Sequence, residues 1–217
     1  GDEPLHHSQG LALFSYFVLN KPPGCITGRG DPEGRSTVYD HVPAHFPPLP
    51  HVGRLDYNTE GLLLFTDDGR LARALLDPEQ HDGPAIEKVY QVKLRPRLHP
   101  DDPRIEALER PLELSEGPSR PARARWVMDR ARSSWIEIVL TEGRHRQVRR
   151  LCEREDLQIV KLRRVSLGPL DLGDLRLRWC RPLTPGEQRA CYAAALPGVE
   201  APALAPIDDS PAARTAR

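Results

Sequence analysis

The chain has 217 residues, and its 31 Lys and Arg balance 31 Asp and Glu, so net charge says nothing about nucleic acid. This length allows one domain or two small ones with a sizeable buried core. No apolar run approaches the ~18 residues of a membrane span, and no signal peptide is visible, so we expect a soluble, cytoplasmic protein without a membrane partner. The four cysteines show neither a CxxC pair nor zinc-ligand spacing, which favours no metal.

Charge is nevertheless distributed unevenly along the chain. Residues 120–150 carry nine Arg against three acids, whereas residues 101–116 carry six acids against two Arg. Such segregation indicates one basic working face and a solvated acidic edge. Chance segregation on an ordinary surface is the alternative.

The N-terminal part contains a single strand pattern. Residues 1–12 are polar without periodicity, and we expect them to be flexible. Residues 13–19 have the composition of a strand, which a proline–proline–glycine turn ends. After a glycine-rich loop at 25–35, Ser36 is expected to cap a short helix that ends at His41.

The stretch Gly53–Gly61, GRLDYNTEG, places an acid between a turn glycine and a buried run. A short extended segment, 51–52, comes before it, and the apolar run Leu62–Phe65 after it is typical of a fully buried strand. A carboxylate held at Asp56 against a sheet core is poorly solvated, so it needs a cationic partner or a functional reason. For an isolated Arg-Leu-Asp triplet, a solvated turn Asp is the alternative.

Strand and helix patterns alternate over the rest of the chain. Asp67 and Asp68 with Gly69 indicate a turn and cap, with an acid pair for metal or phosphoryl transfer as the alternative. Strands are expected at residues 88–94, 122–128, 134–140 and 159–165, and helices at 71–76, 101–109, 144–155 and 184–195. The Ala/Pro-rich stretch 198–217 predicts a disordered tail. We therefore expect an α+β fold, one mixed sheet with packed helices, over residues 13–197.

The string GRLDYNTEGLLLFTDDG resembles the catalytic-aspartate motif of RNA pseudouridine synthases, in particular the bacterial family that contains small-subunit synthase A and large-subunit synthases B, E and F. Four further segments follow the family's order. They are YFVLNKPPG (16–24), EKVYQV (87–92), EGRHRQVRRLCE (142–153) and KLRRVSLGPLDLGDL (161–175). The resemblance extends from Tyr16 to Leu196.

The resemblance implies the pseudouridine synthase fold, a bent, largely antiparallel sheet whose cleft holds the catalytic Asp. Many relatives carry an S4-type RNA-binding domain before the NKP motif. Only 15 residues precede Tyr16 here, so we expect that domain to be absent. The large-subunit synthases of type E also lack it, which makes type E the expected nearest match and implies one uridine near the peptidyl-transferase region.

The family's catalytic residues map onto three positions of this chain. Asp56 takes the place of the catalytic carboxylate, and Arg149 that of its guanidinium partner, which favours the charged form of a carboxylate in an apolar cleft. Tyr90 takes the place of the tyrosine beside the site, where a ring can stack on a flipped base. From the residues alone, Arg149 as a phosphate-binding or surface arginine and Tyr90 as a core tyrosine remain alternatives.

Basic residues near these motifs are expected to contact RNA, since guanidinium groups suit phosphate oxygens. They are Lys21, Arg54, Arg144, Arg146, Arg150, Arg163 and Arg164. For Lys21, a structural role at the end of a strand is an equal alternative. Arg54 and Thr59 are also expected to shape the loop that presents Asp56, with Glu60 paired to Arg54, and His145 is expected to be polar packing.

The resemblance implies a monomeric enzyme without metal or cofactor that isomerises a specific uridine of 23S rRNA after flipping it out of the helix. The first alternative is an RNA-binding ribosome-assembly factor with secondary or lost isomerase activity. The second is a metal-dependent hydrolase built on Asp67 and Asp68.

Overall fold

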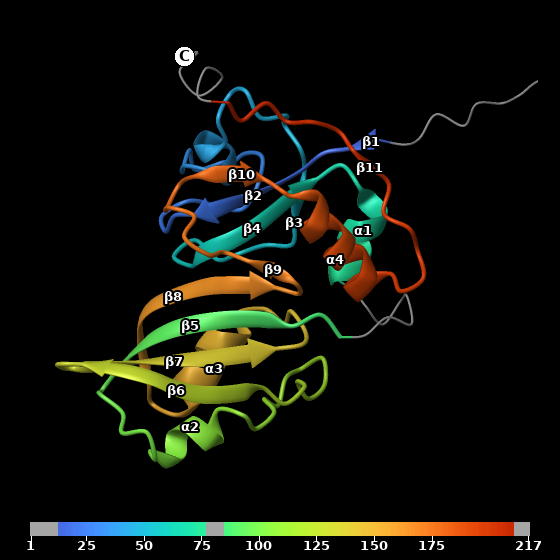
Figure 1. The fold of residues 1–217 in the computed structure, drawn as a ribbon. Coiled ribbons are helices and arrows are strands. Elements are labelled where there is room, and N and C mark those ends of the chain that lie inside the picture. The colour runs from blue at the N-terminus through green and yellow to red at the C-terminus, as the bar shows by residue number, and fades with distance from the viewer. Residues whose placement is uncertain (1–12, 77–84, 211–217) are drawn as a thin grey trace, which may run out of the picture.

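The computed structural model describes residues 13–76 and 85–210, and a nine-stranded sheet forms its centre (Figure 1). The strands are β2 (Tyr16–Lys21), β3 (His51–Val52), β4 (Glu60–Thr66), β5 (Lys88–Arg95), β6 (Arg123–Arg130), β7 (Ser133–Leu140), β8 (Gln158–Leu167), β9 (Leu170–Asp171) and β10 (Cys180–Pro182). Their order is β10-β2-β4-β8-β5-β7-β6, with β3 beside β4 and β9 beside β8. Every pair in this sheet is antiparallel except β4–β8, which confirms the expected α+β class and largely antiparallel sheet.

The sheet consists of two halves that meet at β4 and β8 (Figure 1). The junction is only two residue pairs long, with Glu60 beside Arg163 and Gly61 beside Arg164. Gly61 has a φ of +109°, and a Cβ there would lie 2.1 Å from the Arg164 carbonyl oxygen. Only glycine therefore lets the two strands approach this closely.

Helices cover the two halves separately. Helices α1 (Gly69–Leu76) and α4 (Pro185–Ala195) pack on the half formed by β10, β2 and β4, in one core cluster with Val18, Leu62 and Leu64. The 3-10 helix η1 (Val38–His41) packs on the other face of that half. On this face the rings of Phe17 and Phe65 stack with their centroids 4.6 Å apart. Helices α2 (Pro103–Ala107) and α3 (Gln147–Arg154) close the core of the other half.

The observed helix starts show which of them the local sequence predicted correctly. Thr184 caps α4 as predicted, since its Oγ1 accepts from the Glu187 amide at 3.2 Å. The cap of η1 is Thr37 rather than Ser36. Helix α3 was predicted from residue 144 but starts at Gln147, because Arg146 adopts a left-handed φ of +53°. Residues 144–146 are therefore a loop. Helix α2 likewise occupies only part of the predicted range 101–109.

Asp68 has the structural role that the turn-and-cap interpretation gave it. The side chain is buried, and its Oδ1 accepts from the Leu71 amide at 3.0 Å while its Oδ2 accepts from Tyr16 and Tyr192 hydroxyls. Asp67 instead accepts from the Ser15 amide at 2.8 Å. Within residues 13–76 and 85–210, no three His, Cys, Asp or Glu side chains are placed to hold a metal ion. The hydrolase alternative thus lacks structural support.

Disorder was predicted for residues 198–217, and the described part of this tail, residues 198–210, contains an ordered segment. Strand β11 (Ala203–Leu204) pairs in parallel with β1 (Leu13–Phe14), and Gln188 Nε2 donates to the Pro202 carbonyl at 2.9 Å. Leu204 packs partly buried against the core near α4. A few apolar side chains thus suffice to dock a proline-rich segment that has no periodic pattern. Residues 1–12 and 211–217 lie outside the described residues. In the described part of the chain, no helix has the length and apolarity to cross a bilayer.

Candidate active site

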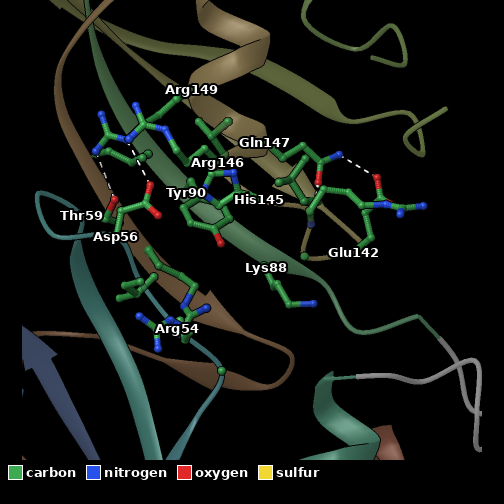
Figure 2. A pocket seen from close by; sticks show the side chains of 18 of the residues that line it. Arg54, Asp56, Thr59, Lys88, Tyr90, Glu142, His145, Arg146, Gln147 and Arg149 are labelled. Atoms are coloured by element: carbon green, nitrogen blue, oxygen red, sulfur yellow. Dashed lines mark hydrogen bonds and ion pairs between the residues drawn. The ribbon is translucent and has the colours of Figure 1, made fainter. Parts of the chain in front are cut away.

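A cavity of about 480 Å³ lies where the two halves of the sheet meet. The loop between β3 and β4 contributes Arg54 and Asp56, and strand β5 contributes Lys88 and Tyr90 (Figure 2). The loop after β7 and the start of α3 close another side, and Arg164 of β8 lies in the wall. Segments far apart in sequence therefore converge on one concave site.

Asp56 and Arg149 form an ion pair in this cavity (Figure 2). Arg149 Nε donates to Asp56 Oδ2 at 3.2 Å, and Arg149 Nη2 donates to Thr59 Oγ1 at 3.2 Å. The Asp56 side chain is 35% exposed, whereas the Arg149 side chain is only 17% exposed. The carboxylate is thus held from one side while its other oxygen remains open to the cavity.

Lys21 fixes the Asp56 loop by hydrogen bonds to the backbone carbonyls of that loop. This side chain is fully buried, and its ammonium donates to the carbonyls of Pro22, Asp56, Tyr57 and Thr59 at 2.9–3.2 Å. Burial lowers the pKa of Lys21, with Cys25, Asp56 and Glu60 opposing it. A group so enclosed cannot reach a phosphate, so the RNA-contact role predicted for Lys21 gives way to the structural alternative.

We expect Lys21→Met to destabilise the fold by about 3–5 kcal/mol, since several buried carbonyls lose their donor. The Asp56 loop should also lose its position, lowering turnover. Urea unfolding and product formation measure the two effects. Lys93→Met is the matched control, because Lys93 lies on β5 outside the cavity lining. Wild-type stability in Lys21→Met would contradict this role.

Tyr90 lies in the cavity wall, close to the acid (Figure 2). It is half-buried, packs against the cores on both sides of the junction, and pairs with Arg164 across β5 and β8. Tyr90 is therefore a packed ring that also lines the cavity, and its stacking on a flipped base stays a prediction.

Glu142 organises the loop that leads into α3. Its carboxylate accepts from Gln147 Nε2 at 2.7 Å, the Arg120 amide at 2.7 Å and Arg144 Nε at 3.1 Å. Gln147 is buried at the first position of α3, two residues before Arg149. This network fixes the helix start that aims Arg149 at Asp56.

The predicted RNA-contacting arginines divide into two groups. Arg54, Arg144, Arg146 and Arg164 line the cavity. Arg150 does not line it, and Arg163 lines another cavity with Glu137 and Ser166. Arg163 and Lys161 form ion pairs with Glu60, which replaces the expected Glu60–Arg54 pair. Arg163 thus braces the sheet junction rather than facing the acid.

Two further features escaped sequence reasoning. His145 was expected to be polar packing, but it is exposed and lines both this cavity and an adjoining one of about 560 Å³. Lys88 was assigned no role, although only 4% of it is exposed and it lines the cavity. The only signal for Lys88 was its place two residues before Tyr90, on the same face of a strand.

The charge of Lys88 is expected to make stability depend on pH. Burial, followed by the like charge of Arg164, lowers the Lys88 pKa from 10.5 to about 8, while Glu142 acts in the opposite direction. Below pH 8 Lys88 is charged in the folded protein, and burying that charge lowers the stability of the fold. Between pH 8 and 10.5 the unfolded chain binds more protons, so stability should rise with pH, by up to about 3 kcal/mol.

The measurement is the free energy of unfolding of the wild type and of Lys88→Met across this range. As pH rises, the free energy of unfolding of the wild type should increase relative to that of the variant, because the variant lacks the titrating group. If the difference in unfolding free energy between the two proteins stays constant from pH 7 to 10, burial does not destabilise the charged form of Lys88.

Comparison with known proteins agrees with this geometry. The profile of the RNA pseudouridylate synthase family matches residues 15–154. The ribosomal large subunit pseudouridine synthase B of Bacillus subtilis is 37% identical over 185 residues, which cover 83% of this chain and 72% of that protein. The protein of the same name from Yersinia pestis is 40% identical over 153 residues, 70% of this chain and 46% of that protein. The chain thus spans about half the length of several curated relatives that it matches.

Solved structures give the same picture. A pseudouridylate synthase crystal structure matches with a TM-score of 0.65 and 30% identity, over 80% of this chain and 72% of that chain. An H/ACA RNP bound to a substrate RNA containing 2′-deoxyuridine matches with a TM-score of 0.54 at 17% identity, over 87% of this chain and 58% of that chain, a likeness of fold alone. With a family profile over residues 15–154, a relative matched along most of both chains and the same fold, this chain belongs to the RNA pseudouridylate synthase family.

Proposed function

We propose that this protein isomerises a specific uridine of large-subunit (23S) rRNA to pseudouridine, with Asp56 as its catalytic carboxylate. The observation that carries the proposal is the ion pair of Asp56 with Arg149 inside a cavity that Tyr90 also lines. The names of the relatives, ribosomal large subunit pseudouridine synthases, support the class of RNA.

The reaction breaks the N1–C1′ bond of uridine, turns the uracil and joins C1′ to C5. C5 then loses its proton and N1 gains one, so that the product is an isomer of the substrate. A base inside a helix cannot do this, so the nucleotide must be flipped into the cavity. Asp56 keeps an open carboxylate oxygen for the sugar or base, and Arg149 places a positive charge beside that carboxylate and holds it in position. Tyr90 offers its ring to the base.

The mouth of the cavity suits an RNA backbone. Arg54 and Arg146 are exposed, and both lie between the Asp56 cavity and the adjoining one. Guanidinium groups in this position can hold the phosphates on either side of the flipped nucleotide. The residues that act on the base lie deeper.

The test uses large-subunit rRNA transcribed in vitro with uridine tritiated at C5. The protein should release tritium from it, with small-subunit rRNA as the control that releases none. Chemical mapping of pseudouridine then identifies the uridine, and its position tests the narrower expectation of a type E enzyme, because the reported relatives carry the type B name. Tight binding without tritium release would favour the ribosome-assembly factor instead.

A further inference from the structure

Arg164 is a buried cation with an unused donor in the wall of the cavity. Only 4% of the residue is exposed, and its Nε donates to the Leu62 carbonyl at 2.9 Å. Its Nη2 is buried and has no hydrogen-bond partner among the described residues. A buried guanidinium donor without a partner carries a desolvation cost, which a ligand in the cavity would relieve.

Lys88 is a second buried cation that lines the cavity (Figure 2). It precedes Tyr90 by two residues on β5, so both side chains leave the same face of the strand. Arg164 lies directly opposite Tyr90 on β8. Tyr90 thus has a buried cationic residue as a neighbour in two directions, one along its own strand and one across the sheet.

We propose that Lys88 and Arg164 bind the carbonyl oxygens of the flipped uracil while its ring lies against Tyr90. This inference rests on the proposed function, because it names the residues that read the base in the same cavity. It makes the two side chains the determinants of base identity, a role separate from the catalytic role proposed for Asp56.

Depth in the cavity favours the base over a phosphate as the ligand. The phosphates stay with the RNA strand at the mouth, where the exposed Arg54 and Arg146 lie. Lys88 and Arg164 are each 4% exposed, and they lie on β5 and β8 at positions next to Tyr90. Burial and the neighbouring charge of Arg164 lower the pKa of Lys88 more than Glu142 raises it.

Two donor-only side chains explain selection against cytosine. Ammonium and guanidinium groups donate hydrogen bonds and accept none. Uracil presents carbonyl oxygens at positions 2 and 4, whereas cytosine presents an amino group at position 4. A cytosine would bring a donor against buried donors, and an unpaired buried polar group is strongly disfavoured.

The experiment replaces the proposed acceptor atoms one at a time. Short transcripts carry uridine, 4-thiouridine or 2-thiouridine at the mapped position, since sulfur is a weak acceptor. The wild type should lose about 10-fold in kcat/KM with at least one thio-RNA, whereas Lys88→Met or Arg164→Gln should lose about 10- to 100-fold with uridine. If a side chain binds the oxygen that sulfur replaces, the variant without that side chain should lose almost no further kcat/KM when it acts on the thio-RNA instead of the uridine RNA.

Lys93→Met, on the same strand outside the cavity lining, is the matched control and should keep the wild-type penalty. Equilibrium binding of the three RNAs gives the same comparison without turnover, and thermal melting checks that each variant is folded. A thio penalty that is unchanged in both variants overturns the inference. An inactive wild type overturns the proposed function instead, so the two failures are distinct.

Discussion

Asp56→Asn should lower the rate of pseudouridine formation by at least about 10³-fold, because a neutral amide cannot serve as the charged catalytic carboxylate. The structure indicates that the fold survives this change. The Asn carbonyl can still accept from Arg149 Nε, and the loop is held through backbone carbonyls by Lys21. RNA binding should therefore stay within a few-fold of the wild type.

Tritium release and RNA affinity, measured side by side, check this expectation. Asp101→Asn is the matched control, since Asp101 is 84% exposed at the start of the α2 region and pairs with His99. That variant should keep full activity. Residual turnover in Asp56→Asn close to that of Asp101→Asn would remove Asp56 from the chemistry and the proposed mechanism with it.

Gly61→Ala should disrupt both the fold and the site. The added Cβ would lie 2.1 Å from the Arg164 carbonyl oxygen and 2.8 Å from its amide nitrogen, and the φ of +109° disfavours any side chain. Backbone strain and overpacking together suggest a loss of about 3–5 kcal/mol. Since β4 and β8 are joined by two residue pairs only, the halves that carry Asp56 and Tyr90 should also separate.

Gly69→Ala, at the start of the next element, α1, is the contrasting variant. Gly69 begins α1, and nothing lies within 4 Å of a Cβ placed there. This variant should be as stable as the wild type or slightly more stable, because alanine favours the helix. Denaturant unfolding of the two variants, together with activity, tests the junction. Equal stabilities would show that the junction tolerates a side chain.

Local signals in the sequence were reliable where they depended on neighbours in the chain. The Thr184 cap, the buried run of β4 and the alternation of β5 all depend on short-range periodicity and hydrogen bonding, and the structure contains each of them. The predicted start of the helix at 144 failed, because a left-handed residue at Arg146 carries no signature in an arginine. Docking of the tail at β11 depended on a distant strand, β1, and was equally invisible.

The motifs also identified Asp56, Arg149 and Tyr90 as one site, and the structure brings them into one cavity. Sequence could not assign the remaining basic residues, since a lysine or arginine looks the same whether it is buried or solvated. Only tertiary packing shows that Lys21 is enclosed by carbonyls and that Arg163 pairs with Glu60.

The sequence by itself therefore determined the family, the strand and helix patterns and the acid at the centre of the site. The tertiary structure alone decided which cations face that acid, which brace the sheet and which, within the described residues, keep a buried donor unpaired. The physical reason is that the energy of a charge depends on its burial and on the groups around it, and here those groups come from strands far apart in the chain.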